Sequence, residues 1–266
     1  MILKEVVGLI PVGGKATRVS PLPCSKELFP IGFRPVDEEG SLRPKVVSHY
    51  LLEKMRLADV TKAYLILREG KWDIPAYFGN GLMVNMDLAY LIMGLPFGAP
   101  YTIDQAYPFV KDAAVVFGFP DIIFQPDDAF IQLLKRQRET DADIVLGGFP
   151  VDVPQKWDML DLSDDGRIRQ IFLKPVKTDL RYSWAIAVWS PAFTHFMHTY
   201  LSSIESAKGQ DNSAYNTSKQ QELCVGDVIQ SAIQNDMKVY SVIFEDGSCI
   251  DIGTPEDMIK AIKDKI

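Results

Sequence analysis

The 266-residue chain is poor in cysteine and histidine, and it carries no excess of positive charge. Its three cysteines, Cys24, Cys224 and Cys249, lack Cys-x-x-Cys spacing, which argues against a disulfide framework and a zinc ribbon. Only three histidines leave little support for histidine acid–base chemistry. The 35 acidic and 28 basic side chains give a net charge of -7. That balance argues against general binding of nucleic acid or of an anionic membrane.

Long apolar runs are also missing from the sequence. No run approaches the roughly 20 residues that a membrane-spanning helix needs, and the apolar start MILKEVVGLIPVGG is too short for a secretory leader. With so few cysteines, a reducing cytoplasm is the expected location. The composition, 47% hydrophobic and 24% charged, is ordinary for a globular protein that buries a sizeable core.

Short apolar runs alternate with helix-like segments in the first half of the chain. Continuous apolar character predicts strands covered on both faces. Strand–helix–strand repetition then predicts an α/β fold with a doubly wound, mainly parallel, Rossmann-like sheet. We expect ligands at the carboxyl ends of its strands. The predicted strands are residues 6–11, 63–67, 113–118 and 143–149, and the predicted helices are 45–58, about 101–110, and 126–139.

The second half is less regular, and it favours one domain with a smaller appended β-rich subregion. A final helix is predicted with Thr254 as its N-cap and proline at its first position. The polar segment 206–221 is predicted to be a mobile excursion. Other predictions are two short strands within 157–175, a strand over 183–190 followed by a helix, a helix within 223–236, and strands at 238–244 and 248–253.

An irregular cationic loop, PVGGKATRVSPLPCSKELFPIG, follows the first predicted strand. Gly13 and Gly14 let the chain turn sharply and expose backbone N–H groups, which bind anions when they follow one another. Arg18 adds a planar donor fork that suits phosphate oxygens, and Lys26 adds a point charge. The loop contains neither G-x-G-x-x-G nor G-x-x-x-x-G-K-[ST]. We interpret it as a triphosphate site, the alternative being a surface loop with solvated cations.

The same loop resembles the signature of the sugar-phosphate nucleotidyltransferases, the pyrophosphorylase family. That signature usually reads G-G-x-G-T-R-L-x-P-L-T, then P-K or S-K, then L-x-P. Glucose-1-phosphate thymidylyltransferases and UTP-glucose-1-phosphate uridylyltransferases are among the members that it resembles. One departure is Ala16, which stands where the family usually has a third glycine. The residues that match in order and spacing are Gly13, Gly14, Thr17, Arg18, Pro21, Leu22, Lys26, Leu28 and Pro30.

Two aspartates are candidate ligands for a divalent cation, which can neutralise and align two phosphate groups during transfer. Asp121 follows the buried run AAVVFGFP, and Asp251 lies between a short strand and a helix start. DIGTPEDM resembles the family's D-x-G-T-P-E-D-L, whereas Gly-Phe-Pro-Asp replaces its usual Gly-Asp. The resemblance implies that Asp121 and Asp251 hold Mg²⁺ beside the α-phosphate. The alternative is a pair of turn or cap aspartates.

The acceptor side resembles the family less closely. FLKP corresponds to the family's E-K-P, which implies that Lys174 holds a sugar 1-phosphate. Leu173 replaces the glutamate that binds sugar hydroxyls in glucose-specific relatives, which puts glucose 1-phosphate in doubt. Asp158 stands at a usual glycine and either binds a hydroxyl or amine of the sugar or caps a turn. Trp184, in the next strand, completes the expected sugar-phosphate-binding set.

The base pocket is the least legible part of the expected site. Gly98, in PFGAPYTIDQA, resembles the glycine of the family's P-x-G-T-A-x-A segment, which lies against the base. Val12 and Thr17 complete the nucleotide-binding set implied for the glycine loop. No aligned glutamine reads a pyrimidine edge, so thymidine, uridine and cytidine nucleotides stay open, with dTTP or UTP as the expected donors. The resemblance implies a nucleotide-binding half over about 1–150 and a sugar-phosphate-binding half over about 151–266.

The resemblance implies Mg²⁺-dependent transfer of a nucleotidyl group from a nucleoside triphosphate to a sugar 1-phosphate, which yields an NDP-sugar and pyrophosphate. A homo-oligomer is compatible with it. One alternative is transfer to a non-sugar phosphate such as phosphocholine. Another is a non-catalytic nucleotide-binding protein on the same fold. The residues expected to carry catalysis are Arg18, Lys26, Asp121, Lys174 and Asp251.

Overall fold

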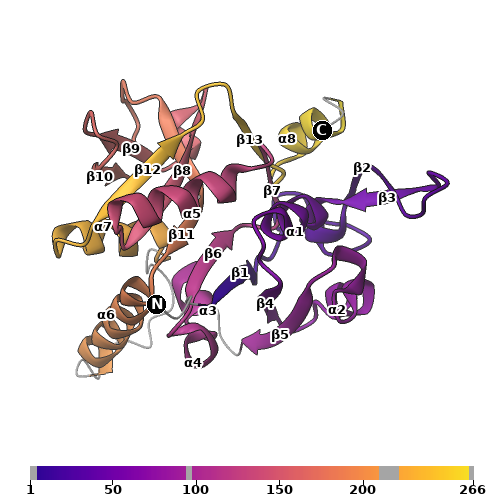
Figure 1. Ribbon diagram of the computed structural model, residues 1–266, viewed down its shortest axis with the longest axis horizontal. Helices are drawn as coiled ribbons and strands as arrows, with labels where there is room; N and C mark the ends of the chain where they lie inside the picture. Colours follow the sequence, from indigo (N-terminus) through magenta and orange to yellow (C-terminus); the bar gives the residue numbers. More distant parts are fainter. Residues whose placement is uncertain (1–4, 94–97, 210–221, 264–266) are drawn as a thin grey trace.

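A mixed sheet of nine strands runs through the computed structural model, which describes residues 5–93, 98–209 and 222–263 (Figure 1). Buried apolar runs form its central strands, because both of their faces are covered by helices. The strands are β1 (Val6–Val12), β4 (Lys62–Arg68), β5 (Asp87–Met93), β6 (Ala114–Gly118), β8 (Ile144–Pro150), β9 (Met159–Leu162), β10 (Ile168–Phe172), β11 (Tyr182–Trp189) and β12 (Val239–Ile243).

The strand order confirms the predicted, mostly parallel α/β sheet. Along the main path the order is β10-β9-β11-β6-β1-β4-β5, and β8 pairs with both β11 and β12. β5, β4, β1 and β6 are parallel neighbours, as are β8 and β12. β11 is antiparallel to both β6 and β8 and joins the two parallel groups.

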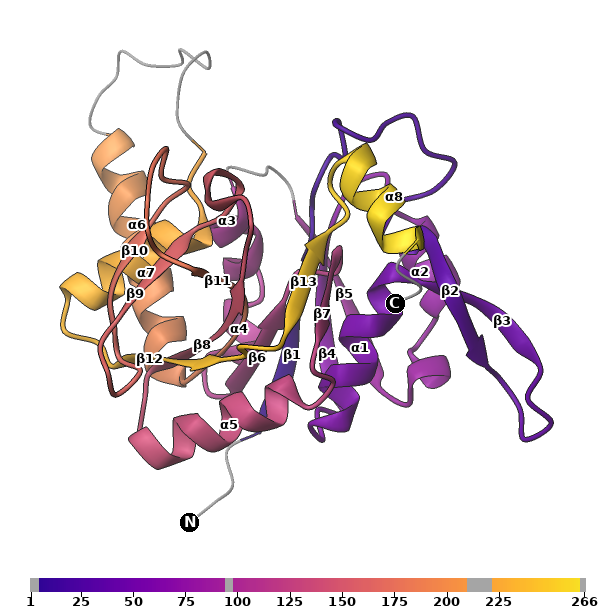
Figure 2. The same ribbon diagram turned by 90° about the horizontal axis from the view of Figure 1, so that it is seen from above.

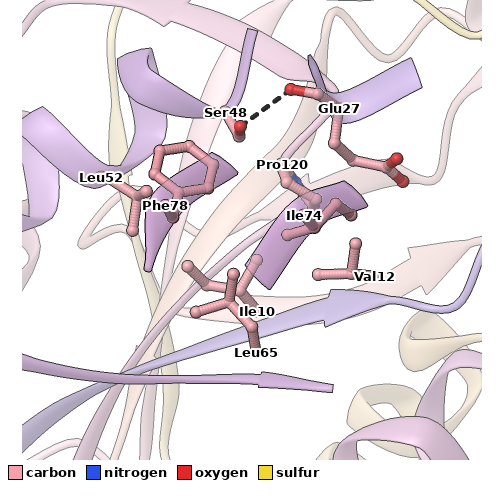
Figure 3. A pocket seen from close by; sticks show the side chains of 9 residues that line it. All are labelled: Ile10, Val12, Glu27, Ser48, Leu52, Leu65, Ile74, Phe78 and Pro120. Atoms are coloured by element: carbon pink, nitrogen blue, oxygen red, sulfur yellow. Dashed lines mark hydrogen bonds between the residues drawn. The ribbon is translucent and has the colours of Figure 1, made fainter. Parts of the chain in front are cut away.

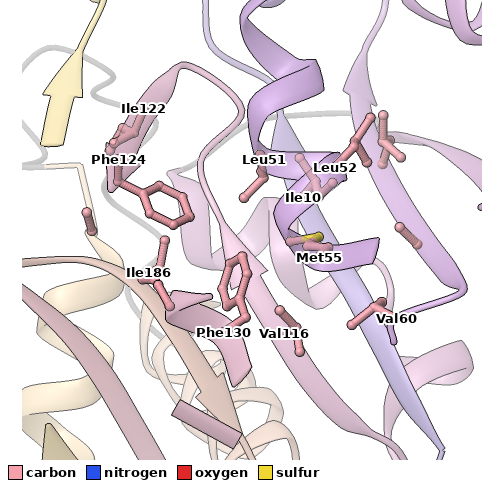
Figure 4. Close-up of a cluster of buried hydrophobic side chains, with 14 of the residues drawn as sticks. Ile10, Leu51, Leu52, Met55, Val60, Val116, Ile122, Phe124, Phe130 and Ile186 are labelled. Carbon is pink, nitrogen blue, oxygen red and sulfur yellow. The ribbon is translucent and has the colours of Figure 1, made fainter. Parts of the chain in front are cut away.

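Helices cover both faces of this sheet. One apolar core lies under α1 and α5, and a second lies under α3, α4, α6 and α7. Figure 4 shows Leu51 and Met55 of α1 and Phe130 of α5 packed beside Val116 of β6 and Ile186 of β11. The helices are α1 (Val47–Leu57), α2 (Asp73–Phe78), α3 (Ala99–Asp104), α4 (Tyr107–Val110), α5 (Ala129–Thr140), α6 (Pro191–Gly209), α7 (Val225–Gln234) and α8 (Pro255–Lys263).

Two small antiparallel pairs flank the main sheet. β2 (Pro30–Pro35) and β3 (Leu42–Val46) form a hairpin that projects from the body of the molecule (Figure 2). β7 (Ile122–Gln125) pairs with β13 (Ser248–Asp251), which joins the end of the chain to its middle. Short 3-10 turns complete the described elements at η1 (Lys26–Leu28), η2 (Leu82–Val84) and η3 (Pro154–Lys156).

The four strands predicted in the first half are confirmed, but two helices differ from expectation. The helix predicted over 45–58 begins at Val47, because the preceding residues pair with β2 as strand β3. The helix predicted over about 101–110 is divided into α3 and α4. Pro108 lacks the N–H group that would continue the first helix, so the chain starts a new one there.

The third predicted helix, 126–139, begins later, at Ala129. The reason is that β7 extends to Gln125, so the chain must turn before α5 can start. Sequence periodicity missed β7 altogether, together with the hairpin β2–β3, α2 and β5.

The predicted elements of the second half are confirmed as β9, β10, β11, α6, α7, β12, β13 and α8. The hydroxyl of Thr254 accepts the N–H of Asp257 at 3.2 Å, which is the predicted N-cap of α8. Most of the predicted excursion at 206–221 lies outside the described residues. Within the described part of the chain, no helix has the length and apolar character needed to cross a bilayer.

Candidate active site

The two candidate metal ligands lie side by side at one edge of the sheet. Asp121 follows β6 and immediately precedes β7, and Asp251 ends β13. The antiparallel register pairs Asp251 with Ile122, and the N–H of Ile252 donates to the carbonyl of Asp121 at 3.0 Å. Residues 130 positions apart in the sequence are therefore fixed as neighbours by the backbone of the β7–β13 pair.

Each aspartate has a cationic partner from the glycine-rich loop. The Lys26 ammonium forms an ion pair with the Asp121 carboxylate, and the two side chains are only 12% and 15% exposed. The Arg18 guanidinium lies 3.9 Å from Asp251, at the more open end of the site. The N–H of Gly253 donates to the other Asp251 carboxylate oxygen at 2.8 Å. Four of the five predicted catalytic residues therefore meet at one place.

The fifth, Lys174, lies farther along the same cleft. A groove of about 770 Å³ has Lys174, Arg18 and Asp251 among its lining residues. Lys174 has a positive φ of 40°, so its backbone adopts a conformation that L-residues rarely use. The groove thus connects the cationic loop to the lysine predicted to hold the acceptor phosphate.

The two aspartates influence each other electrostatically. Burial first, and then the negative charge of Asp121, raise the pKa of Asp251 above its ordinary value. Burial acts to lower the pKa of Lys26, but the charge of Asp121 and its hydrogen bond outweigh burial and raise it. A cation between the two carboxylates would relieve the repulsion that raises the pKa of Asp251.

The donor set is small but chemically suitable for magnesium. No group of three or more His, Cys, Asp or Glu side chains suited to a metal occurs among residues 5–93, 98–209 and 222–263. Mg²⁺ is commonly held by one or two carboxylates, with substrate phosphates and waters as its other ligands. Asp121 and Asp251 fit that pattern as a pair.

The glycine loop is shaped by close backbone approach. A Cβ on Gly13 would lie 2.3 Å from the terminal methyl group of Met93, so a larger residue there would require the Met93 side chain to move. Gly14 lies against the Lys26 side chain, whose Nζ would be 3.8 Å from a Cβ at that position. Val12 is fully buried at the end of β1, whereas Thr17 is exposed.

Ala16 carries the strain that its unusual residue type suggests. Its φ is 53°, in the left-handed region that favours glycine. Its carbonyl accepts the N–H of Val19 at 3.1 Å, which closes a turn that contains Thr17 and Arg18. The positive φ gives a physical reason for the glycine that the expected signature has at this position.

Gly98 is connected to the glycine loop through Thr102. Its φ is 121°, and a Cβ there would lie 2.4 Å from the Leu223 carbonyl oxygen. Its own carbonyl accepts the N–H and the hydroxyl of Thr102. The Thr102 hydroxyl would in turn lie 3.5 Å from a Cβ on Gly13, so one threonine contacts both glycine positions.

On the acceptor side, Asp158 and Leu173 meet at one point. A Cβ on Gly226, in the first turn of α7, would lie 2.6 Å from the Asp158 carboxylate and 2.8 Å from the Leu173 side chain. Burial is the main cause that raises the pKa of Asp158, and the nearby Lys174 charge partly opposes it. A carboxylate therefore reaches the neighbourhood of residue 173 from the adjacent strand.

Two polar atoms of this region are buried and have no hydrogen-bond partner among the described residues. They are Oδ1 of Asp158 and Nε1 of Trp184. The strands that carry them are neighbours, since Ser183 pairs with Met159 and its hydroxyl donates to the Asp158 carbonyl at 2.9 Å. The Trp184 ring lies 6.1 Å from that of Phe119, two residues before Asp121. The Trp184 ring is therefore connected to the segment that carries Asp121 through Phe119.

The Nucleotidyl transferase family model matches residues 7–266 of the chain. This chain belongs to the nucleotidyl transferase family. The match confirms the resemblance on which the site residues were chosen.

Curated relatives of this nucleotidyl transferase family member are distant but align along nearly its whole length. A low-salt glycan biosynthesis nucleotidyltransferase from Haloferax volcanii is 25% identical over 258 residues, and a glucose-1-phosphate thymidylyltransferase from Streptomyces antibioticus is 26% identical over 258 residues. The alignments include 96% and 95% of this chain. The chain spans 64% of the length of each relative.

A solved structure supports the same fold. A protein from Bacillus anthracis, described as a glucose-1-phosphate thymidylyltransferase, aligns with a TM-score of 0.77. The alignment covers 98% of this chain and 95% of that chain, at 18% identity. It confirms the nucleotidyl transferase fold.

Three residues at or beside the loop were not among the predicted site residues. Glu27 is buried directly after Lys26, Lys71 lies between β4 and α2, and Asp73 is the first residue of α2. Lys71 forms a 2.6 Å ion pair with Glu27, and Asp73 accepts two hydrogen bonds from Ser25. A Lys-x-Asp pair just after a predicted strand was the available signal, but nothing in the sequence indicates its partner.

Proposed function

We propose that the protein transfers a nucleotidyl group from a nucleoside triphosphate to a sugar 1-phosphate with the aid of Mg²⁺. The observation that carries the proposal is the meeting of Lys26–Asp121 and Arg18–Asp251 beside the glycine loop. Family membership and the activities for which the relatives are named support the same reaction class.

On the donor side, Arg18 and Lys26 would bind the triphosphate. Their positive charges would stabilise the negative charge that develops on the phosphates during transfer. The successive backbone N–H groups around Gly13 and Gly14 would bind phosphate oxygens. Gly98 would lie against the base, with Val12 and Thr17 completing the nucleotide site.

Asp121 and Asp251 would hold the magnesium ion. When bound there, the ion would neutralise charge on the reacting phosphates. Lys26 forms an ion pair with Asp121, and Arg18 lies near Asp251, so each carboxylate has a cationic partner beside it. An oxygen of the acceptor phosphate would form a bond to the α-phosphorus, the bond to the bridging oxygen would break, and pyrophosphate would leave.

On the acceptor side, Lys174 would orient the acceptor phosphate, which gives rate by positioning. Asp158 and Trp184 would bind the rest of the acceptor, since each has a buried polar atom without a partner among the described residues. Asp158 accepts and Trp184 donates. The acceptor therefore carries a hydroxyl or amine directed at Asp158 and an acceptor oxygen directed at Trp184.

The decisive experiment measures pyrophosphate release across a matrix of nucleoside triphosphates and phosphorylated acceptors. Each pair is assayed with Mg²⁺ and with excess EDTA. We expect release with dTTP or UTP and a sugar 1-phosphate, and no release in EDTA. Absence of release with every pair, despite nucleotide binding, would favour a non-catalytic nucleotide-binding protein.

A second candidate is transfer to a non-sugar phosphate such as phosphocholine. The observation that favours it is the apolar Leu173 beside the buried Asp158 carboxylate, because the pair would suit a small cationic acceptor. The same matrix separates the two candidates. Release with phosphocholine and none with any sugar 1-phosphate would replace the first proposal by the second.

A further inference from the structure

Three consecutive residues of the loop are held from one side by a short connection. Ser25 and Glu27 flank Lys26, and each is bound by a residue near the start of α2: Lys71 precedes the helix, and Asp73 begins it. Asp73 accepts the N–H of Ser25 at 2.7 Å and its hydroxyl at 2.8 Å. The Lys71 ammonium donates to the Glu27 carboxylate at 2.6 Å. The backbone is therefore fixed on both sides of Lys26.

The Glu27–Lys71 pair is among the most deeply buried charges of the described chain. Their side chains are 3% and 5% exposed. The second carboxylate oxygen of Glu27 has no partner among the described residues. Glu27 also borders a cavity of about 10 Å³, and its carbonyl accepts the Ser48 hydroxyl at 2.8 Å (Figure 3).

Stability alone is a poor explanation for such a pair. Removing two charges from water costs free energy that their mutual attraction often fails to recover. Apolar residues of similar volume at the same place are frequently neutral or stabilising. The buried pair instead fixes a position, because the hydrogen bond from Lys71 holds one carboxylate oxygen of Glu27 against the β4–α2 connection.

The Glu27–Lys71 pair interacts electrostatically with Lys26 and Asp121. Burial first lowers the pKa of Lys71, the Glu27 charge raises it in part, and Lys26 and Asp121 also act on it. Burial raises the pKa of Glu27, and the Asp121 charge adds to the same direction. Lys26 therefore interacts electrostatically with the Glu27–Lys71 pair as well as with its partner Asp121.

We propose that Lys71 and Asp73 form a clamp that holds the side chain of Glu27 and the backbone of Ser25, so that the Lys26 ammonium is presented to the triphosphate. The inference rests on the proposed function, because Lys26 is assigned to the triphosphate there. Lys71 and Asp73 are positioning residues that act through Lys26. The clamp explains why the loop can be irregular in sequence and still place one ammonium reproducibly.

The test is a double-mutant cycle on kcat/KM for the nucleoside triphosphate. Asp73→Ala removes one half of the clamp. Glu27→Gln with Lys71→Met removes the other half without leaving a single buried charge, which guards against simple failure to fold. We expect each change to lower kcat/KM at least tenfold. In a Lys26→Ala background, assayed at raised protein concentration, each should change it less than twofold.

Asp143→Ala is the matched control for Asp73→Ala. Asp143 also accepts one backbone N–H, from Lys238 at 2.9 Å, and one serine hydroxyl, from Ser190 at 3.5 Å, but it lies at the start of β8. We expect its kcat/KM to stay within twofold of the wild type. The comparison separates loss of a shared hydrogen-bond pattern from loss of the clamp.

A second readout does not depend on turnover. Reductive methylation followed by mass spectrometry measures how accessible the Lys26 ammonium is. In the wild type it is paired and 12% exposed, so labelling should be slow. We expect Asp73→Ala to accelerate labelling of Lys26 at least threefold and Asp143→Ala to leave it unchanged.

Two results would overturn the clamp. One is unchanged kcat/KM in the clamp variants, and the other is an equal loss in the wild-type and Lys26→Ala backgrounds. If the wild type releases no pyrophosphate with any substrate pair, the proposed function fails, and the labelling rate alone decides the clamp. Unchanged labelling would then reject it, and accelerated labelling would support it as a device that positions Lys26.

Discussion

The donor and acceptor sides of the cleft differ in how their buried polar groups are satisfied. On the donor side, Lys26 is paired with Asp121, and Lys71 with Glu27. The Glu27 carboxylate keeps one unpartnered oxygen there. On the acceptor side, Asp158 Oδ1 and Trp184 Nε1 are both buried without a described partner, and they lie on neighbouring strands.

The difference follows from what each side has to bind under the proposed function. A triphosphate is the same for every nucleotide, so its site can be preorganised by fixed ion pairs. An acceptor is recognised by groups that only the correct ligand completes, because a wrong ligand leaves buried polar atoms unpaired. The comparison therefore predicts strong loss of turnover from donor-side changes and loss of selectivity from acceptor-side changes.

The largest effect is expected from Asp121→Asn. The change removes the charge that pairs with Lys26 and with the proposed magnesium ion, while the side-chain volume stays the same. We expect turnover to fall by at least about 100-fold, with the thermal unfolding transition preserved. Pyrophosphate release and circular dichroism measure the two quantities. Asp128→Asn, on an exposed residue nearby, is the control, and near-normal turnover of Asp121→Asn would remove Asp121 from the mechanism.

Breaking the Glu27–Lys71 pair on the donor side should lower the free energy of unfolding. Lys71→Met leaves the Glu27 carboxylate buried without its cation, which should destabilise the fold by about 3–5 kcal/mol. Adding Glu27→Gln should restore most of that loss, because no unpaired charge remains. Urea unfolding measures both. Equal stability of the single and double variants would mean that the pair does not hold Glu27 as the geometry indicates.

Much of the fold and of the candidate site was predictable from the sequence, but the buried Glu27–Lys71 pair was not. Apolar runs predicted the strands, the loop signature predicted Lys26, and the segment DIGTPEDM predicted Asp251. Glu27 and Lys71 could not be paired, because their contact joins residues 44 apart and neither has a periodic pattern. Long-range contacts of this kind depend on which strands become neighbours, and local sequence does not determine that.

Short elements were missed for a related reason. β7 has four residues and is defined by its pairing with β13, more than 120 positions later. Its apolar residues alone are compatible with either strand or helix. The same pairing is what places Asp121 beside Asp251, so the proximity of the two carboxylates could be inferred from family resemblance but not from spacing.

On the acceptor side, Asp158→Asn should raise the KM for the acceptor about tenfold, because a hydrogen bond to a charged group is worth about 1.5–3 kcal/mol. kcat at saturating acceptor should change little. Asp164→Asn, exposed in the adjoining turn, is the control. Initial rates across acceptor concentrations measure the effect. A change in kcat with an unchanged KM would contradict an acceptor-binding role.

The same aspartate predicts a pH dependence. Burial raises the pKa of Asp158 in the folded protein, so it is protonated at a higher pH than an ordinary aspartate. As the pH falls through that raised pKa, the carboxylate loses its charge and the acceptor KM should rise. Its contribution to stability has the opposite trend: it is full below the unfolded-state pKa and is lost as the pH rises. Asp158→Asn should remove both trends, and an unchanged profile in the variant would assign them to another group.

The smallest expected effect concerns Ala16, a strained residue in the glycine-rich loop on the donor side. Its positive φ of 53° costs an L-residue roughly 1–2 kcal/mol. Ala16→Gly should relieve that strain but also gain unfolded-state entropy, which leaves a net stabilisation of about 1 kcal/mol or less. Ala192→Gly, in α6, should instead destabilise by roughly 0.5–1 kcal/mol, since glycine is unfavourable in helices. A higher melting temperature for Ala16→Gly and a lower one for Ala192→Gly would show that the turn keeps its positive φ in solution. A lower melting temperature for both variants would show that alanine is not strained at position 16. Retained turnover in Ala16→Gly would then assign the preorganisation of the donor side to its ion pairs rather than to this residue.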